Sequence, residues 1–402
     1  MNAAAAAEVS ALLKQLIGCR SVTPADGGAL DLAAEVLRGA GFSVRRLPCG
    51  DVDNLWAADC DAPTLLFAGH IDVVPPGDLS AWSGDPFVAE ERGGYIYGRG
   101  AADMKSGAAA MICAACRLRR AGIGGVAVLL TSDEEGEAIH GTRHVAELRK
   151  RENAPMIPFV IVGEPTCDEA FGDTIKIGRR GSLTARIVVR GVQTHAAYPR
   201  DGGNPIHLLH SALSEVFRRF AELRRDSDSK RAQKSGEEAA KTDSLSPDDF
   251  PPPGMQIVKI ASGVAENVVP ASAAATVNFR YTPGENADDL RRLTEESLQT
   301  AAADRWECEW RHGASPFVSA PGALVAALRE SIFSACGRRA KLSAGGGTSD
   351  GRFLREIAGE LAEFGVVGET MHEPDERVAV DSPPMLSQIY EQTARKLLAD
   401  GN

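Results

Sequence analysis

The sequence predicts a layered α/β protein, and three observations support this class. Segments with helical apolar spacing alternate with short apolar strands, which is typical of helices packed on a sheet. The length of 402 residues exceeds what one ordinary core supports and suggests two domains. Hydrophobic residues at 44% and charged residues at 25% are values of a globular protein, so we expect neither a disordered nor a collagen-like chain.

Charge and hydropathy narrow the possible partners. No apolar run reaches the roughly 18 residues of a membrane helix, and residues 1–8 lack the basic stretch of a signal peptide, so we expect a cytoplasmic protein without a membrane partner. The net charge of −11 argues against a broad nucleic-acid surface, which needs a basic face. An anionic substrate would therefore need a local basic pocket.

Helix and strand patterns alternate in the first part of the chain. Residues 75–87 interrupt them with turn-forming and polar residues, so we expect a loop there that lies over a functional site. The other elements expected here are helices at residues 9–17 and 29–37, strands at residues 42–44 and 54–57, a helix after Asp103 and a helix near residues 141–150.

Four apolar strands of this part end in residues that could hold a metal ion or move a proton. In an open α/β sheet, sites assemble at the carboxyl ends of strands, so residues far apart in sequence converge there. Each residue alone would more often be a turn or capping residue, but their agreement favours a metal site. The strand segments are Leu65–Val74 with His70 and Asp72, Tyr95–Lys105 with Asp103, Val126–Gly136 with Glu134 and Glu135, and Phe159–Thr166 with Glu164.

These residues form a plausible ligand set for two metal ions. One zinc ion takes about four ligands, so five protein ligands suit two ions about 3.5–4 Å apart if one carboxylate bridges them. Glu134, beside Glu135, is suited to accept a proton from an activated water, although the two would need an irregular backbone to face one site. The candidate metal ligands are His70, Asp103, Glu135, Glu164 and His372.

Two other patterns have a structural explanation that we favour. His140 and His144 have the i, i+4 spacing of a helical metal site, but they lack the intervening Glu of a zincin motif, so solvated helix surface is the preferred interpretation. Cys113 and Cys116 lie in a segment that reads as a buried helix, and no second CxxC completes a zinc site. We expect reduced cysteines in the core at both positions.

After Glu164 the pattern changes to that of an α+β unit. Residues 225–253 are charged and almost free of apolar residues, so we expect a disordered insertion there. Residues 315–402 return to the first style, so a domain of residues 181–314 is expected to be inserted into one formed by residues 1–180 and 315–402. The elements expected after Glu164 are two strands along residues 174–190, further strands at residues 255–260 and 274–281, and helices at residues 206–223 and 286–300.

The motifs at these positions resemble the M20 family of di-zinc amidohydrolases and aminopeptidases. The resemblance covers nearly the whole chain apart from residues 225–253, and the motifs are specific as a set. They are Gly69–Pro75, Gly98–Lys105, Thr131–Gly136 and Gly163–Thr166. Four further segments are most similar to the members that remove a succinyl group from a diamino acid: Pro75–Gly77, Gly178–Ser182, His195–Pro199 and Gly346–Phe353.

The resemblance implies a catalytic zinc-aminopeptidase-like domain with an inserted dimerisation domain, and it implies a role for each ligand. His70 and Glu164 would hold one zinc ion, Glu135 and His372 the other, and Asp103 would bridge. Asp72 would orient His70. Glu134 would act as the general base. Imidazole and carboxylate ligands suit zinc, cobalt and manganese alike, and zinc is expected first, with cobalt possible.

The resemblance also implies a homodimer and an anionic N-acyl diamino acid as substrate. His195, supplied by the partner subunit, would donate to the oxyanion of the tetrahedral intermediate. Arginine suits the substrate carboxylates, which would supply the basic pocket required above. The positions that match the family's substrate-binding residues are Arg179, Ser182, Tyr198, Asn267, Arg280, Gly347 and Thr348.

The activity implied is hydrolysis of N-succinyl-L,L-2,6-diaminopimelate to succinate and L,L-diaminopimelate, a step toward lysine. Gly368 stands where better-known members have Asn, which puts one substrate hydrogen bond in question. The alternatives within the family are acetylornithine deacetylase and metallo-carboxypeptidase activities. A catalytically inactive binding protein would be expected to have lost a ligand or Glu134, and all are present. A nucleic-acid module would need a more basic charge balance.

Overall fold

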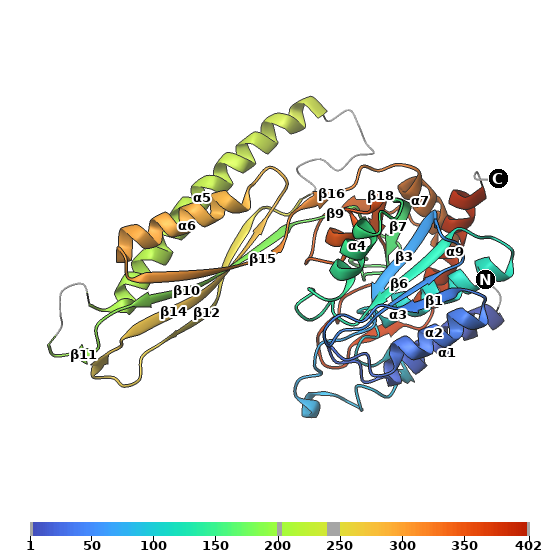
Figure 1. Ribbon diagram of the computed structural model, residues 1–402, viewed down its shortest axis with the longest axis horizontal. Helices are drawn as coiled ribbons and strands as arrows, with labels where there is room; N and C mark the ends of the chain where they lie inside the picture. The colour runs from blue at the N-terminus through green and yellow to red at the C-terminus, as the bar shows by residue number, and fades with distance from the viewer. Residues whose placement is uncertain (1–2, 199–202, 239–249, 400–402) are drawn as a thin grey trace. The chain divides into compact units, whose positions relative to one another are not determined.

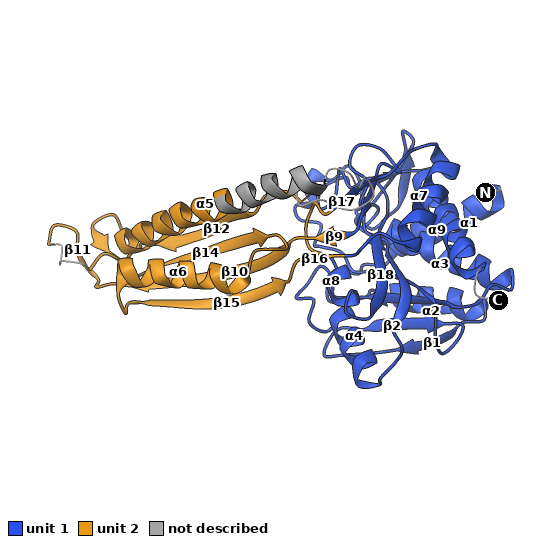
Figure 2. Ribbon diagram, turned by 90° about the horizontal axis from the view of Figure 1, so that it is seen from above, with its two compact units in different colours: residues 1–177, 319–343, 349–402 blue, residues 178–318, 344–348 orange. Residues whose placement is uncertain are grey.

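The computed structural model describes residues 3–198, 203–238 and 250–399, with the backbone alone for residues 226–238. The chain folds as two units, which Figure 2 distinguishes by colour. Unit 1 comprises residues 1–177, 319–343 and 349–402, and unit 2 comprises residues 178–318 and 344–348. Because unit 2 interrupts the sequence of unit 1, the predicted class of an α/β domain with an inserted α+β domain is confirmed.

Unit 1 is built on an eight-stranded mixed sheet with the order β1-β2-β6-β3-β7-β18-β8-β17. The central strands β6, β3, β7 and β18 run parallel to one another. Strands β3 and β6 are buried along their whole length, as their continuous apolar sequences require. The strands are β1 (Ser43–Arg46), β2 (Asn54–Ala58), β3 (Leu65–His70), β6 (Val126–Thr131), β7 (Ile157–Val162), β8 (Thr174–Lys176), β17 (Lys341–Ser343) and β18 (Ala358–Glu363).

Helices α1, α3, α7 and α9 of unit 1 pack against one another (Figure 1), and α4 contacts α8 (Figure 2). A Cβ on Gly107 of α3 would stand 2.3 Å from the carbonyl oxygen of Gly163, so only glycine allows this close approach. The contact holds the helix that follows Asp103 against the segment that carries Glu164. The helices are α1 (Ala3–Gly18), α2 (Ala29–Gly39), η1 (Leu79–Ala81), α3 (Lys105–Arg120), α4 (Thr142–Arg151), α7 (Ala323–Cys336), α8 (Gly351–Leu354) and α9 (Ser382–Ala399).

The sequence suggested that the strand before Asp103 belongs to the main sheet, and this is wrong. The strand is β5 (Tyr95–Tyr97), which lies between β4 (Glu90–Arg92) and β19 (Arg377–Ala379) in a separate three-stranded sheet. Since β5 precedes Asp103 and β19 follows His372, their antiparallel pairing brings two candidate ligands together. Apolar alternation predicts a strand but not the sheet that the strand joins, so the sequence could not place β5.

Unit 2 is a four-stranded antiparallel sheet with the order β12-β14-β10-β15, covered on one face by α5 (Pro205–Glu238) and α6 (Ala287–Ala302) (Figure 1). Its core contains Leu183, Val216, Phe220, Phe279 and Leu290. The strands are β10 (Gly181–Arg190), β12 (Gly254–Ser262), β14 (Ser272–Tyr281) and β15 (Trp306–Ala314), with the short pairs β9 (Gly178–Arg179) with β16 (Phe317–Val318) and β11 (Thr194–His195) with β13 (Val268–Val269).

The expected disordered insertion at residues 225–253 is wrong in its first half. Helix α5 continues to Glu238. The sequence of this stretch is rich in Arg, Lys, Gln and Glu, which are good helix formers, but it lacks the apolar spacing on which the expectation depended. Residues 239–249 lie outside the described residues. The intrinsic helix propensity of these residues therefore extends the helix beyond the part that an apolar stripe could predict.

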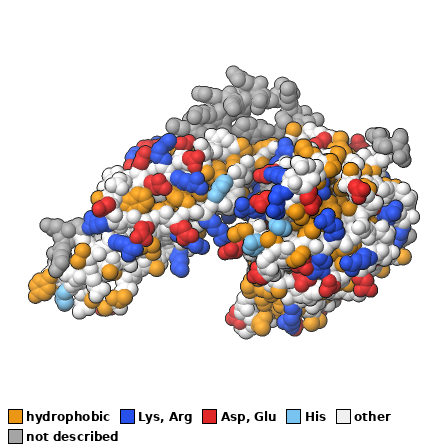
Figure 3. Space-filling view, viewed as in Figure 1, with side chains coloured by type: hydrophobic (Ala, Val, Ile, Leu, Met, Phe, Trp, Pro, Cys, Tyr) orange, Lys and Arg blue, Asp and Glu red, His pale blue; other side chains and the backbone are white. Residues whose placement is uncertain are grey.

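The exposed surface carries both signs of charge. Figure 3 shows Lys and Arg side chains interspersed with Asp and Glu over the described residues in view. This mixture agrees with the sequence argument against a broad basic face. Among the described helices, none combines the length and apolarity needed to cross a bilayer.

Candidate metal centre

His70, the last residue of β3, is buried and has a defined orientation. Its Nδ1 lies 2.9 Å from the backbone oxygen of Asp72. Because a carbonyl oxygen can only accept, Nδ1 carries a proton and Nε2 is the nitrogen available to a cation. Nε2 faces Asp103 Oδ1 at 3.2 Å and Glu164 Oε1 at 3.7 Å.

The ionisation of His70 reflects this acidic surrounding. Burial alone would lower the pKa of His70, but the hydrogen bond to Asp103 and the charges of Glu164 and Asp72 raise it well above its usual value. In the protein without metal, a proton on Nε2 thus compensates the surrounding carboxylates. A divalent cation would replace that proton.

Asp103 lies between the two candidate imidazoles. Its Oδ1 is 3.2 Å from His70 Nε2, and its Oδ2 is 3.5 Å from His372 Nε2. Burial raises the pKa of Asp103, but the hydrogen bonds from His372 and His70 outweigh this effect and hold it well below its usual range. One oxygen facing each imidazole is the arrangement that a bridging carboxylate requires.

His372 lies beside the second carboxylate of the set. Its Nε2 is 2.8 Å from Glu135 Oε1, and the hydrogen bonds with Asp103 and Glu135 raise the pKa of His372 to about 10. Its φ angle of 64° is in the left-handed region, which non-glycine residues rarely adopt. The surrounding contacts must therefore stabilise this turn.

Glu134 and Glu135 follow β6 in an irregular turn. Neighbouring residues of a regular strand point in opposite directions, so only an irregular backbone lets both face one site. The carboxylate of Asp72 accepts the backbone N–H of Glu134 at 3.3 Å and of Glu135 at 3.1 Å. Burial raises the pKa of Asp72 to about 6. Asp133 fixes the next part of the turn by accepting the N–H groups of Ala138, Ile139 and His140.

The described residues contain two groups whose ligand atoms lie within 4.8 Å of one another: His70 with Asp103 and Glu135, and His70 with Glu134 and Glu164. His372 adjoins the first group. Desolvation and the charge of Glu164 raise the pKa of Glu134 well above its usual value. The structure thus brings together all five predicted metal ligands and the predicted base. Imidazoles and carboxylates fit divalent cations such as zinc or cobalt.

The predicted substrate-binding residues all lie in unit 2 and form two groups. The first surrounds the start of β10, where Ser182 lies opposite Arg280 on β14. Arg179 Nη1 donates to the carbonyl of Gly347 at 3.1 Å. Thr348 is the next residue, so this group presents two arginines and small polar residues at one end of the unit 2 sheet.

The second group contains His195, Tyr198 and Asn267. His195 lies on β11, the N–H of Ala196 donates to the carbonyl of Asn267, and the rings of His195 and Tyr198 are 5.7 Å apart. His195 Nδ1 accepts the N–H of Ala197 at 3.1 Å, so its Nε2 carries the donor proton. Figures 1 and 2 show β11 at the opposite end of unit 2 from β9. The intervening strand β10 is roughly 30 Å long at about 3.3 Å per residue.

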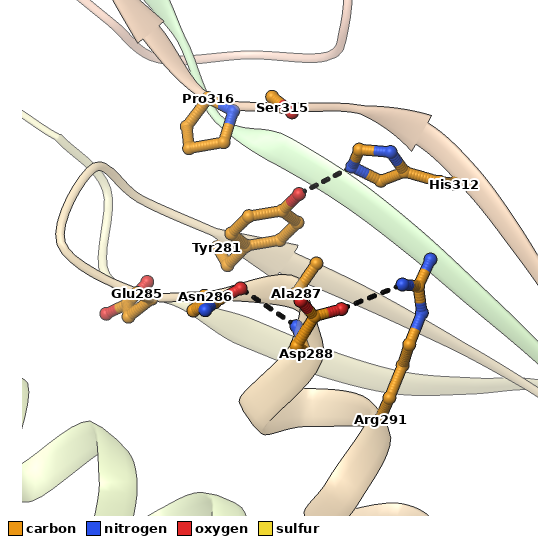
Figure 4. Close-up of a pocket in the computed structure, with 9 residues that line it drawn as sticks. All are labelled: Tyr281, Glu285, Asn286, Ala287, Asp288, Arg291, His312, Ser315 and Pro316. Carbon is orange, nitrogen blue, oxygen red and sulfur yellow. Dashed lines mark hydrogen bonds and ion pairs between the residues drawn. The ribbon is translucent and has the colours of Figure 1, made fainter.

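A separate polar pocket of about 290 Å³ lies in unit 2 beside the start of α6 (Figure 4). The hydroxyl of Tyr281 donates to the carbonyl of Ala314 and lies 2.8 Å from His312 Nε2. Asp288 pairs with Arg291 at 2.9 Å. None of the predicted site residues lines this pocket, and it contains His312, to which the sequence assigned no role.

The alternative metal patterns do not form clusters in the described residues. Cys113 and Cys116 are buried in α3, and burial raises the pKa of the two thiols to about 12 and about 11, as expected of core residues. His140 Nδ1 lies 3.3 Å from Cys49 Sγ, and among the residues that the structure describes no third potential ligand accompanies this pair or His144.

Sequence reasoning missed two buried residues at the metal centre, Arg99 and Glu376. Arg99 Nη1 lies 2.8 Å from Glu376 Oε2. Arg99 stands inside the motif that carries Asp103, and Glu376 follows His372 by four residues, so proximity to two candidate ligands was the available signal. Charge type alone could not show that both side chains are buried.

Comparisons with known proteins show which family the chain resembles. Residues 66–396 match peptidase family M20/M25/M40. A succinyl-diaminopimelate desuccinylase from Aromatoleum aromaticum is 42% identical over 403 residues, which cover 99% of each chain. A protein of the same name from Alkalilimnicola ehrlichii is 41% identical over 97% of this chain and 99% of that protein.

Solved structures show the same fold at lower identity. An M20 family metallo-carboxypeptidase from Sulfolobus solfataricus has a TM-score of 0.75 and 19% identity, with 99% of this chain and 100% of that chain covered. A dinuclear metal binding peptidase of the M20 family from Bacillus subtilis has a TM-score of 0.69 and 16% identity, with 99% of each chain covered. With the match to residues 66–396 and the full-length relatives, the chain belongs to peptidase family M20/M25/M40.

Proposed function

We propose that this chain hydrolyses N-succinyl-L,L-2,6-diaminopimelate to succinate and L,L-diaminopimelate with two bound divalent cations. The observation that carries the proposal is Asp103, whose two carboxylate oxygens face His70 and His372. Relatives about 41–42% identical over nearly the full length, all named succinyl-diaminopimelate desuccinylase, support the choice of substrate. The reaction is a step in diaminopimelate and lysine biosynthesis, a cytoplasmic process.

The ligands divide into two sets in this proposal. His70 and Glu164 would hold one cation, Glu135 and His372 the other, and Asp103 both. When bound, the cations, which we propose to be zinc with cobalt as a substitute, would supply Lewis acidity to the amide carbonyl and lower the pKa of water at the site toward neutrality. The orientation of His70 by the Asp72 carbonyl supports its part in this arrangement.

Glu134 moves the proton in this reaction. It would accept a proton from the attacking water and then donate it to the nitrogen of the leaving amine. Two contacts support this role: the backbone of Glu134 is fixed by the Asp72 carboxylate, and its own carboxylate lies in the group with His70 and Glu164. A carboxylate fixed at that point is within reach of water between the ligands.

Substrate recognition falls to unit 2. Arg179 and Arg280 would bind the succinyl and diaminopimelate carboxylates, since guanidinium groups pair with carboxylates in a two-pronged geometry. Ser182, Gly347 and Thr348 would add hydrogen bonds at the same end of unit 2. Tyr198 and Asn267 lie at the other end, beside His195.

We infer that the active protein is a homodimer in which His195 acts on the substrate of its partner. Within one chain, His195 and Arg179 lie at opposite ends of unit 2, about the length of β10 apart. A single copy of unit 2 therefore does not bring both groups to one substrate molecule. The proton on His195 Nε2 suits donation to an oxyanion, an interaction worth a few kcal/mol in other hydrolases.

The test is an end-point assay of succinyl-diaminopimelate, acetylornithine and a dipeptide, with zinc-loaded protein and with the same protein after chelation. We expect succinate release that chelation abolishes and zinc restores, with little cleavage of the other two compounds. Zinc-dependent cleavage of acetylornithine or the dipeptide instead would overturn the substrate assignment. Binding of zinc without cleavage of any compound would contradict the enzyme assignment.

A further inference from the structure

Glu376 is a buried carboxylate whose hydrogen bonds all go to the segment that carries Asp103. Its Oε1 accepts the backbone N–H of Ala102 at 2.9 Å and of Asp103 at 3.0 Å. Its Oε2 accepts the N–H of Gly100 at 2.9 Å and the Arg99 guanidinium at 2.8 Å. Glu376 therefore fixes the backbone of Asp103 although it stands four residues after His372.

Arg99 makes the reciprocal connection from the Asp103 segment to the turn of His372. Besides its bond to Glu376, its guanidinium donates to the carbonyls of Glu373 at 3.3 Å and His372 at 3.4 Å. The guanidinium also lies 5.0 Å from the ring of Trp82. Arg99 is 1% exposed and Glu376 is not exposed, so water does not compete for these bonds.

The turn that these bonds secure is not one that the chain adopts freely. His372 has φ 64° and Asp375 has φ 56°, both in the left-handed region. Such conformations persist where surrounding contacts determine them. A buried ion pair is in general weak support for stability, because desolvation offsets much of its attraction. Because the Arg99–Glu376 pair connects the segments that carry Asp103 and His372, its role is to position these two residues.

We propose that Arg99 and Glu376 form a positioning pair that sets the distance between Asp103 and His372 and thereby the affinity for the cation held by Asp103, Glu135 and His372. The inference rests on the proposed two-cation site but not on the identity of the substrate. Residues that orient metal ligands typically change metal affinity 10–100-fold when they are replaced.

The test compares cation binding by Glu376→Gln and wild-type protein. Glutamine keeps the shape of the side chain but replaces one accepting oxygen by an NH₂ group, which faces N–H donors. Metal-free proteins are titrated with Co²⁺ by visible absorption and with Zn²⁺ against a competing chelator. We expect Glu376→Gln to bind one ion much as wild type does and the second about 10–100-fold more weakly, with an altered Co²⁺ spectrum for that second ion.

The matched control is Glu391→Gln. Glu391 accepts from Arg117 Nε at 2.7 Å between α9 and α3, which is an ion pair of similar length that touches no candidate ligand. This variant should keep both cation affinities even if its thermal midpoint falls. A lowered midpoint therefore does not by itself produce the expected result.

Two wild-type affinities and an unchanged Co²⁺ spectrum in Glu376→Gln would overturn the inference, as would a wild-type chain that takes up only one ion. If Glu376→Gln does not fold, Arg99→Lys carries the test with the same criteria, because lysine keeps the charge but cannot reach the carboxylate and both carbonyls. A wild-type chain that binds two ions but cleaves no succinylated substrate would refute the proposed function and leave this inference intact.

Discussion

Asp72 contacts His70 through its backbone rather than its side chain. The carbonyl oxygen of Asp72 lies 2.9 Å from His70 Nδ1, whereas the nearer carboxylate oxygen lies 3.6 Å away. The carboxylate instead accepts the N–H groups of Glu134 and Glu135. One residue thus orients an imidazole with its main chain and two glutamates with its side chain.

Replacing Asp72 with Asn should therefore disturb the glutamate turn more than the orientation of His70. The amide would present an NH₂ group to a backbone N–H, so we expect metal affinity to fall about 10–100-fold and kcat to fall with it. Metal titration and steady-state kinetics of the same preparation would measure both. If only the binding of the ion held by His70 and Glu164 became weaker, the assignment of the Asp72 carboxylate to the glutamate turn would be wrong.

Glu134→Gln should abolish turnover while the protein retains its metal ions. Glutamine cannot carry the proton from water to the leaving amine, so we expect kcat to fall at least about 100-fold. Metal content by elemental analysis and initial rates of succinate release test the two parts separately. Glu137→Gln, an exposed glutamate three residues along the chain, serves as control and should keep both. Substantial activity in Glu134→Gln would exclude Glu134 as the base.

Arg179→Met should remove the preference for a succinyl over an acetyl group. The lost charge-assisted hydrogen bonds should lower kcat/KM for the succinyl substrate about 10–100-fold. The N-acetyl analogue lacks the carboxylate and should lose much less. Arg186→Met provides the control, because Arg186 is exposed on the adjoining strand β10 and pairs only loosely with Glu309, at 3.6 Å. Equal losses for both substrates would indicate a general structural effect.

Mixing two inactive variants tests the sharing of His195 between subunits. A His195→Ala chain keeps its metal ligands, and a Glu134→Gln chain keeps its His195. In a mixed dimer, one site combines the intact parts of both chains. After subunit exchange, activity should therefore return to about a quarter of the wild-type value if the chains pair at random. If mass spectrometry shows that mixed dimers are present but activity does not return, His195 is not shared between subunits.

The protonation of His372 predicts how the metal-free protein responds to pH. Hydrogen bonds with Asp103 and Glu135 raise its pKa to about 10, against about 6.5 in an unfolded chain. A raised pKa stabilises the folded state fully below pH 6.5, and this stabilisation is lost as the pH rises through about 10. The thermal midpoint of chelator-treated protein should fall over this interval, and the fall should be smaller in His372→Asn. Identical pH profiles by calorimetry would contradict the pairing.

Much of the site could be predicted because chemistry and strand ends coincide in the sequence. His70 ends one apolar strand, and Glu135 and Glu164 follow two others; the structure places these strands side by side as β3, β6 and β7. Asp103 was predicted on the assumption that its strand belongs to the same sheet, but that strand, β5, joins another sheet. The backbone contact of Asp72 and the burial of Glu376 could not be predicted, because both depend on tertiary packing that residue type and spacing do not encode.

Helix α5 shows the corresponding limit for the fold. The apolar spacing ends near Leu223, but the helix continues to Glu238. Periodic apolar residues reveal a helix only where it covers a core. The positions of β11 and β13 were equally inaccessible, because pairs of two residues are too short for a recognisable alternation.

The position of β18 determines when the sheet of unit 1 can be completed during synthesis of the chain. This strand lies between β7 and β8, although unit 2 is translated between β8 and β18. At 5–20 residues per second, a ribosome needs on the order of ten seconds or more to pass from β8 to β18. Until then β7 lacks its partner on one edge, and β8 lacks partners on both edges, because β17 is also translated after residues 178–318. Chaperones that cover strand edges would have their main opportunity there, and the predicted ligand set would be complete only once His372 has left the ribosome.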